Sequence, residues 1–197
     1  PPDGPALLSG MTDVADDRLP ERVQTTRLLL RRWKHDEASV LTDLIQGNIE
    51  HLGPWMPWTK FEPQTVAERV ALIETWTREW EDGGGAVFGT FFDGGAIGSC
   101  GLMRRVGAGA LDIGYWIADD HARRGFASEI ASALTTTAFG VAGIERVEIH
   151  TDEANEASAG VPSKLGFHRD RVIERAPEAP GESGRLIIWT MAKADWP

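Results

Sequence analysis

The chain has 197 residues, of which 30 are acidic and 20 basic, so its formal net charge is −10. This length is typical of one domain. The negative charge argues against a nucleic-acid partner, because binding to phosphates needs a basic surface. The single cysteine excludes an internal disulfide and a cysteine-based zinc site, and no metal site is expected. We expect a cytoplasmic protein without a membrane partner, since the sequence lacks a bilayer-spanning apolar run and a signal-peptide layout.

The N-terminal part of the sequence divides into an extension and the start of a domain. Residues 1–22 are rich in Pro, Gly and Asp, which predicts an N-terminal extension to a domain of residues 23–197. The apolar stretch 26–33 predicts a first strand, and Asp36 opens a helix.

Two further segments precede the middle of the chain. Residues 48–58 hold two prolines and two tryptophans without periodicity, which predicts a loop. Residues 65–80 carry apolar side chains three and four positions apart, which predicts an amphipathic helix.

The rest of the sequence alternates between strand and helix patterns. Asp93-Gly94-Gly95 indicates a hairpin between strands 86–92 and 96–103. The later expected elements are strand 111–117, helix 128–139, strand 146–151, helix 155–165, a strand after Phe167 and a last strand 186–191. About seven strands and four helices predict a single α/β domain, with a mixed, mostly antiparallel sheet flanked by helices.

The segment 111–127, LDIGYWIADDHARRGFA, has the pattern of an anion site. A strand gives way to a turn in which Gly125 permits close backbone approach, and a helix follows. The free N–H groups and the positive dipole end of that helix favour an anion such as a pyrophosphate, and Arg123 and Arg124 add positive charge. The segment lacks the Lys-Ser/Thr of a P-loop and the spaced glycines of a Rossmann fingerprint.

Three motifs in order resemble one known superfamily. A-R-R-G-F-A after G-Y-W-I resembles the acyl-CoA signature Gln/Arg-x-x-Gly-x-Gly/Ala of the GCN5-related N-acetyltransferases (GNAT). N-x-x-S at 155–158 with K-L-G-F at 164–167, and the upstream segment 48–58, are similar to its RimJ/RimL branch. That branch acetylates protein N-termini and has relatives that acylate small molecules. The resemblance covers residues 24–196 and implies a GNAT fold with splayed central strands, and acetyl-CoA as the cofactor.

The resemblance also implies roles for individual residues. The backbone at Ile117 and Ala118 would pair with pantetheine, and Asn155 would hydrogen-bond the same arm. Ser158 would stabilise or protonate the departing thiolate. The pyrophosphate would be held by the backbone N–H groups of Arg123, Arg124, Gly125, Phe126 and Ala127.

The sequence departs from the superfamily pattern at two positions. Ala122 stands where the signature has Gln or Arg, which is tolerable because the contact is mainly through backbone. Pro162 falls near the usual position of a tyrosine acid, and the lone tyrosine, Tyr115, lies in a strand instead. Pro162 also cannot donate to the carbonyl of Ser158, so a kink or a late helix start is expected there.

Three residues are candidates for the general base, unless water alone relays the proton. His150 ends its strand where some members carry a glutamate, and an imidazole has an ordinary pKa near 6.5. Glu178 resembles a glutamate of RimL-like enzymes, and Asp112 lies two residues before Gly114. The alternative for each residue is a solvated strand-edge or loop side chain.

Three other side chains have alternative interpretations. Trp55 and Trp58 could line the acceptor groove or could fasten their loop to the body of the domain. Cys100 lies in an apolar strand without a partner base, which indicates a buried thiol rather than a nucleophile.

These patterns predict an acetyltransferase that moves acetyl from acetyl-CoA to a primary amine by direct attack in a ternary complex. The acceptor could be a protein N-terminus or a small molecule such as an antibiotic, a polyamine or an amino acid, and the acidic surface favours a cationic one. Three alternatives stay open: a succinyl donor, a non-catalytic CoA-binding sensor or scaffold, and a homodimeric assembly.

Overall fold

The computed structural model describes residues 18–197. The strands in this part of the chain form one open sheet in the order β1-β2-β3-β4-β5-β6-β8-β7. Only β5 and β6 pair in parallel, and the other neighbours are antiparallel. The strands are β1 (Arg22–Gln24), β2 (Leu28–Arg32), β3 (Ala86–Phe92), β4 (Gly95–Met103), β5 (Ala110–Ile117), β6 (Arg146–Asp152), β7 (His168–Glu174) and β8 (Arg185–Ala192).

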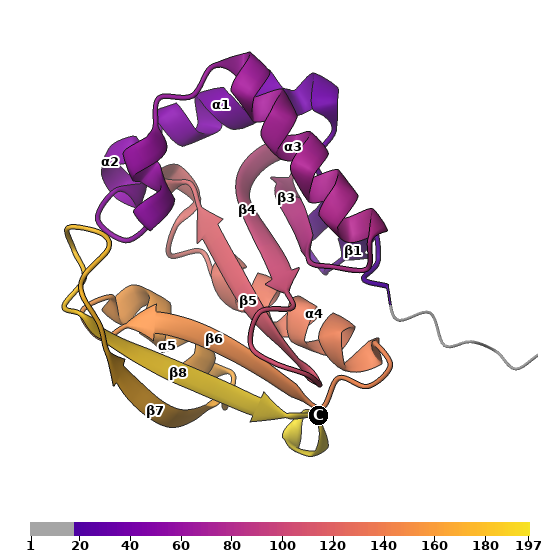
Figure 1. Cartoon of the computed structure of the whole chain (residues 1–197), viewed down its shortest axis with the longest axis vertical. Coiled ribbons are helices and arrows are strands. Elements are labelled where there is room, and N and C mark those ends of the chain that lie inside the picture. Colours follow the sequence, from indigo (N-terminus) through magenta and orange to yellow (C-terminus); the bar gives the residue numbers. More distant parts are fainter. Residues whose placement is uncertain (1–17) are drawn as a thin grey trace, which may run out of the picture.

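Five α-helices cover this sheet in the described part of the chain (Figure 1). They are α1 (Ala38–Gln46), α2 (Ile49–Leu52), α3 (Val66–Glu81), α4 (Phe126–Gly140) and α5 (Glu156–Lys164). The predicted mixed, mostly antiparallel α/β domain is confirmed. The structure adds β1 and the short α2, which lies within the predicted loop 48–58.

Two hydrophobic cores lie on either side of the sheet. The helix α4 buries its apolar residues, among them Ile130 and Leu134, in the larger core, whereas α1 and α3 bury Leu41 and Ile73 in the smaller one. Each such side chain is nearly or fully inaccessible to solvent, and burying one contributes about 1.5–3 kcal/mol. In the apolar stripe of α3, Ile73 is buried and Val70, Trp76 and Trp80 are partly buried, whereas Val66 at the helix start is exposed.

The central strands β5 and β6 diverge halfway along their length. Their parallel register ends at the pair Ile113 and Ile149. Beyond that point β5 continues along β4 to Ile117, and β6 continues along β8 to Asp152. The predicted splay is confirmed, and it leaves two strand edges that face each other without pairing.

The last residues of the predicted N-terminal extension belong to the folded body. Leu19 is 2% exposed and its carbonyl accepts a hydrogen bond of 2.6 Å from the indole of Trp80. Residue Arg22 begins β1, whereas residues 1–17 lie outside the described part of the chain.

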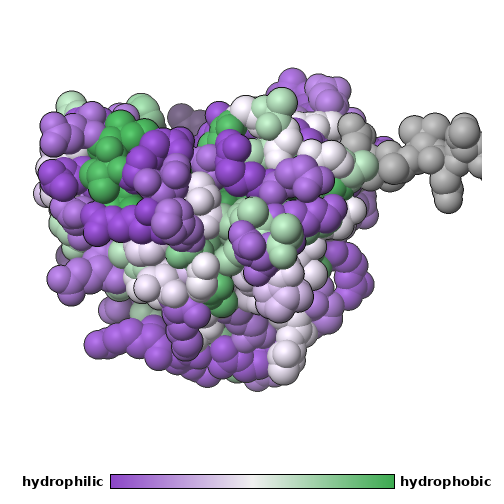
Figure 2. Space-filling model, turned by 90° about the horizontal axis from the view of Figure 1, so that it is seen from below, coloured by the Kyte–Doolittle hydropathy of each residue, from purple (hydrophilic) through white to green (hydrophobic). Residues whose placement is uncertain are grey.

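Polar residues dominate much of the surface. Seen from below, most residues are hydrophilic and the hydrophobic ones form small groups (Figure 2). The edge strand β7 is mainly exposed and rich in charge, which discourages pairing with another chain. No helix within residues 18–197 has the length and apolar character needed to cross a membrane.

Candidate active site

A cavity of about 980 Å³ opens beside the splay of β5 and β6. Its walls come from the segment 55–61, from α1 and α3, from β3 to β6, from the start of α5 and from the segment between β7 and β8. Seven of the catalytic, cofactor-binding and acceptor residues proposed from the sequence line it together: Trp55, Trp58, Asp112, His150, Asn155, Ser158 and Glu178.

The N-terminus of α4 has the geometry of an anion site. Gly125 precedes the helix with φ 80° and Arg123 has φ 57°, so the chain turns sharply before the first helical residue. The N–H of Glu129 donates to the carbonyl of Gly125 at 3.1 Å. The N–H groups of the three preceding residues, Phe126 to Ser128, therefore have no carbonyl within the helix to bond. Such groups favour a phosphate.

Arg27 adds a cation at this helix end. Its Nη1 donates to the carbonyl of Arg124 at 3.1 Å, and its guanidinium lies 4.3 Å from the centre of the Phe126 ring. The guanidinium of Arg124 lies 5.0 Å from the ring centres of both Phe92 and Phe126. Two stacked arginines therefore flank the free N–H groups.

Glu129 holds Arg27 in this position. Its carboxylate accepts from Arg27 Nε at 2.7 Å and from the Thr25 hydroxyl at 2.5 Å. Burial alone would raise the pKa of Glu129, but these hydrogen bonds outweigh burial and lower the pKa below its ordinary value. The carboxylate thus stays ionised at neutral pH and anchors the turn between β1 and β2 to α4.

At the end of β5, the N–H of Ile117 faces the gap between the splayed strands, whereas the N–H of Ala118 does not. The Ala118 N–H donates to the carbonyl of Ile97 at 2.8 Å, and the Ala118 carbonyl accepts from His121 at 2.9 Å. The N–H of Ala118 is therefore already bound by β4, while the pairing of pantetheine with the backbone at Ile117 and Ala118 stays a prediction. Successive N–H groups in a strand point to opposite edges, so that of Ile117 faces the gap.

The helix α5 begins with a side-chain cap at the cavity wall. The Oδ1 atom of Asn155 accepts a hydrogen bond of 3.1 Å from the N–H of Ser158. This is the usual arrangement for asparagine at a helix N-cap. The side-chain amide N–H groups of Asn155 are left as its donors towards a ligand.

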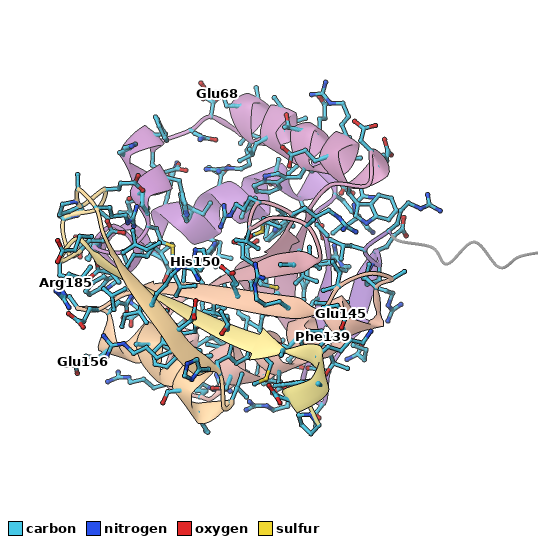
Figure 3. The ribbon with its side chains drawn as sticks, turned by 60° about the horizontal axis from the view of Figure 1, so that its bottom comes forward. Glu68, Phe139, Glu145, His150, Glu156 and Arg185 are labelled. Atoms are coloured by element: carbon cyan, nitrogen blue, oxygen red, sulfur yellow. The ribbon has the colours of Figure 1, made fainter. Side chains whose placement is uncertain are left out.

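His150 and a buried glutamate form a pair on β6. The Nε2 of His150 lies 2.7 Å from Oε2 of Glu148, and the other carboxylate oxygen accepts from Arg146 Nε at 2.9 Å. The Glu148 side chain is 2% exposed, whereas that of His150 is 28% exposed and lines the cavity. In Figure 3, the labelled His150 lies near the centre of the molecule, away from its outline. A carboxylate at one ring nitrogen orients the other towards a substrate.

Asp112 lies beside this pair on β5. It is the register partner of Glu148 and is 2% exposed. Its Oδ2 accepts from Arg105 Nε at 2.8 Å, but its buried Oδ1 has no hydrogen-bond partner among the described residues. Burial raises the pKa of Asp112 above its ordinary value, although the contact with Arg105 opposes this.

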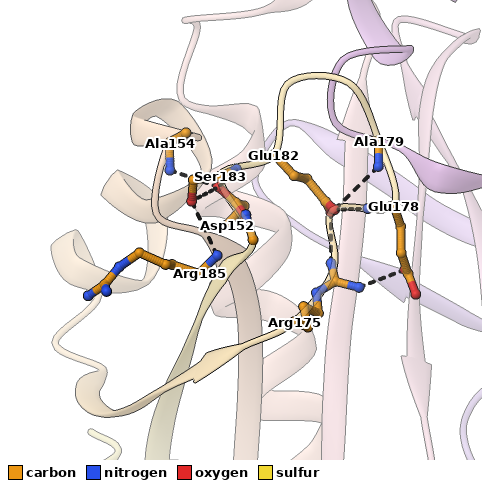
Figure 4. A network of polar contacts seen from close by, with 9 residues as sticks. Asp152, Ala154, Arg175, Glu178, Ala179, Glu182, Ser183 and Arg185 are labelled. Carbon is orange, nitrogen blue, oxygen red and sulfur yellow. Dashed lines mark hydrogen bonds and ion pairs between the residues drawn. The ribbon is translucent and has the colours of Figure 1, made fainter.

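Glu178 belongs to an ion-paired loop between β7 and β8 (Figure 4). Arg175 contacts Glu178 at 2.6 Å and Glu182 at 2.8 Å, and Glu182 also accepts from the N–H of Glu178 at 2.6 Å. The Glu178 side chain is 55% exposed. Its carboxylate therefore helps to hold the loop, which makes Glu178 a weaker candidate base than His150.

The same loop is fastened to the tryptophan segment. Gly181 donates its N–H to the carbonyl of Pro54 at 2.8 Å, and a Cβ at this glycine would lie 2.6 Å from that oxygen. The ring of Trp58 lies 6.3 Å from that of Trp116, tilted by 47°. Trp58 therefore packs against the sheet and lines the cavity at once, and Trp55 lines it as well.

Cys100 is confirmed as a buried thiol. It is 4% exposed, and burial raises its pKa to about 12. A thiol that stays protonated at neutral pH is a poor nucleophile. Its place at the cavity wall is consequently that of a small apolar group.

A buried ion pair lies on the α3 side of the cavity. Arg69 Nη2 contacts Glu62 at 2.6 Å, with the two side chains 2% and 4% exposed. The Nε of Arg69 is buried and has no hydrogen-bond partner among residues 18–197. Arg69 is among the residues that line the cavity, although this unpartnered Nε is itself inaccessible to solvent.

Comparison with known proteins identifies the family. Residues 27–168 match the acetyltransferase (GNAT) domain family. The chain is a member of the GNAT family. It is therefore an N-acetyltransferase enzyme of the class that the sequence motifs predicted.

Several relatives support the RimJ/RimL-like branch of GNAT. The "Putative ribosomal N-acetyltransferase YdaF" of Bacillus subtilis is 28% identical over 171 residues, which cover 86% of this chain and 93% of the relative. A solved structure described as "Probable acetyltransferase" has a TM-score of 0.82 at 26% identity and covers 89% of this chain and 98% of its own. Mycobacterium smegmatis RimJ shares the fold, with a TM-score of 0.81 at 20% identity and 90% of each chain covered.

Sequence reasoning about this GNAT chain missed three polar contributors to the site. Arg27 contacts the distant Arg124, Arg69 pairs with Glu62 seven residues earlier, and Glu148 contacts His150 on the same face of β6. For Glu148 a signal existed, because residues i and i+2 of a strand share a face and His150 was already a candidate. For Arg27 and Arg69 no local pattern pointed to the site.

Proposed function

We propose that this GNAT enzyme transfers the acetyl group of acetyl-CoA to a primary amine by direct attack. The observation that carries the proposal is the convergence of Ser158, the His150–Glu148 pair and the edges of the splayed strands at one cavity. Solved relatives with this fold were obtained with CoA or acetyl-CoA, among them RimJ, RimL and the microcin C7 self-immunity protein MccE.

The residues at α4 fit the phosphates of this ligand. The free N–H groups after Gly125 supply neutral donors, and Arg27, Arg123 and Arg124 supply positive charge next to them. Because Gly125 has φ 80°, a side chain there is strained whatever space surrounds it.

The splay fits the pantetheine arm. An extended amide chain can add to an unpaired strand edge, and the N–H of Ile117 and the side-chain amide of Asn155 are donors at this gap. Acetyl-CoA supplies the reactive thioester when bound. The Ser158 hydroxyl would then donate a hydrogen bond, and finally its proton, to the leaving sulfur.

We assign the general base to His150. With Nε2 held by Glu148, the Nδ1 atom would take the proton of the incoming ammonium directly or through one water. The unpartnered Oδ1 of Asp112 would bind the same ammonium before deprotonation. Glu178 keeps its pairing with Arg175 and would stabilise the wall of the groove.

We assign the acceptor to the class of peptide N-termini. A cavity of about 980 Å³ is at the upper end of the range for small-ligand pockets, so it has room for several residues. Relatives named as ribosomal N-acetyltransferases agree with this class.

The test is acetyl transfer to a panel of amines, read by mass spectrometry and by release of free thiol. We expect N-terminal peptides to be acetylated at least tenfold faster than polyamines or free amino acids. Faster turnover of a small amine would overturn the peptide assignment, and absence of turnover with every amine would favour a CoA sensor.

The phosphate site has its own test by calorimetry. Gly125→Glu would weaken CoA binding by about 100-fold, or about 2.8 kcal/mol, through strain and charge repulsion. The matched control is Gly140→Glu at the other end of α4, where an added Cβ meets no atom within 4 Å. Equal affinity of the two variants would remove the pyrophosphate from this helix end.

A further inference from the structure

The helix α5 has an unusual gap in its backbone ladder. Pro162 lies inside the helix and has no N–H, so it cannot bond the carbonyl of Ser158 four residues earlier. A carbonyl left without a partner near the protein interior costs free energy. Ser158 therefore needs a donor from outside its own helix.

That donor is the only tyrosine of the chain. The hydroxyl of Tyr115 donates to the carbonyl of Ser158 over 3.4 Å, a long hydrogen bond. Tyr115 lies on β5, beyond the last residue that pairs with β6, whereas α5 follows β6. The bond thus crosses the splay and joins two elements that strand pairing leaves apart. Burial raises the pKa of Tyr115 to about 12, so the phenol remains a donor at neutral pH.

Ser158 is held on its other side as well. Its N–H donates to Oδ1 of Asn155 at 3.1 Å, while its carbonyl accepts from Tyr115. Both backbone polar groups of one residue are therefore bound by side chains rather than by the regular helix ladder. All three residues line the cavity, so this clamp lies where the reaction is expected.

We propose that Tyr115 is a positioning residue, which replaces the helical hydrogen bond lost at Pro162 and thereby holds Ser158 at the sulfur of the thioester. This inference rests on the proposed function, because it takes Ser158 as the group that meets the leaving thiolate. It assigns the tyrosine of β5 a role that acts through a backbone carbonyl, without proton transfer from the phenol.

The test is a double-mutant cycle between Tyr115 and Pro162. Tyr115→Phe lowers kcat by about fivefold with little change in the KM for either substrate, because one modest hydrogen bond is lost. Pro162→Ala restores an N–H that can bond the Ser158 carbonyl within the helix. In that background Tyr115→Phe should change kcat by less than about twofold. Ser163→Ala, an exposed substitution on the same helix, is the matched control.

Two outcomes would overturn the inference. One is the same loss of kcat from Tyr115→Phe in both backgrounds, since the phenol would then act without the Ser158 carbonyl. The other is full activity of Tyr115→Phe with Pro162 in place.

Amide hydrogen exchange separates this inference from the proposed role of Ser158. If Ser158→Ala leaves kcat unchanged, the catalytic role of Ser158 fails. The clamp is then judged by the exchange of the Ser158 and Ala159 amides, which should accelerate in Tyr115→Phe and recover when Pro162→Ala is added. Unchanged exchange in Tyr115→Phe would show that no clamp exists.

Discussion

Glu148 and His150 lie two residues apart on β6, and their side chains meet at 2.7 Å on the wall of the cavity. The glutamate is buried and also accepts from Arg146, so the imidazole is held from behind while it faces the cavity. A carboxylate that orients an imidazole in this way is a common element of acid–base sites. The relationship makes His150 the first residue to test.

Replacement of His150 by glutamine should lower kcat by about 100-fold, within the usual contribution of a positioned general base. The control is His168→Gln on the exposed strand β7, which should keep the native kcat. A His150→Gln enzyme with an unchanged kcat would assign the base elsewhere.

Replacement of Asp112 by asparagine should change how stability depends on pH. Burial raises the pKa of Asp112 in the folded protein, so the folded state binds more protons than the unfolded state between the two pKa values. Stability contributed by this group is therefore present below the ordinary aspartate pKa and is lost as pH rises through the folded pKa.

Asp112→Asn removes this loss, so its Tm relative to the native protein should rise between pH 4 and pH 7. Thermal unfolding at both pH values measures the difference. Asp43→Asn, at an exposed position of α1, should show no such trend. A relative Tm that falls over the same interval would contradict the assignment of the raised pKa to Asp112.

Replacement of Arg27 by methionine should weaken CoA binding by about tenfold, equivalent to about 1.4 kcal/mol. The loss should shrink at high salt, because the arginine acts on the phosphates through charge. Its pair with Glu129 is partly exposed, at 41% and 17%, so the effect on stability should stay below about 1 kcal/mol. Isothermal titration at two salt concentrations measures the affinity, with Arg22→Met on β1 as the control.

Replacement of Trp55 by alanine should raise the KM for the amine acceptor several-fold and leave the Kd of CoA unchanged. The indole lines the cavity, and the neighbouring Pro54 carbonyl accepts from the N–H of Gly181. Steady-state kinetics with a peptide acceptor and CoA titration measure the two quantities. A lowered Tm with an unchanged KM would show instead that Trp55 only fastens its segment to the domain.

Local patterns in the sequence were sufficient for most of the elements. The strand predicted at 86–92 is β3, and the helix predicted at 65–80 is α3 within one residue at each end, because Thr65 and Glu68 form a capping box. The sequence did not predict β1, the strand at the N-terminal edge of the sheet. Three-residue β1 has no pattern of its own and exists because β2 pairs with it.

The candidate site divides in the same way between local and tertiary causes. The turn and the free N–H groups at the start of α4 were predictable, because such groups belong to the first turn of any helix and Gly125 lies next to it in the sequence. Likewise the lack of a donor for the Ser158 carbonyl followed from Pro162 alone.

Only the tertiary structure decided which side chains complete these sites. Arg27 reaches α4 from about 97 residues away, and Tyr115 reaches Ser158 across 43 residues. Tertiary structure also decided the partner of Ala118, whose N–H donates to the carbonyl of Ile97 on the neighbouring strand β4. The local sequence shows which backbone N–H or carbonyl groups lack a hydrogen-bond partner nearby in the chain. The group that supplies the partner is decided by which strand or helix packs beside them in the folded protein.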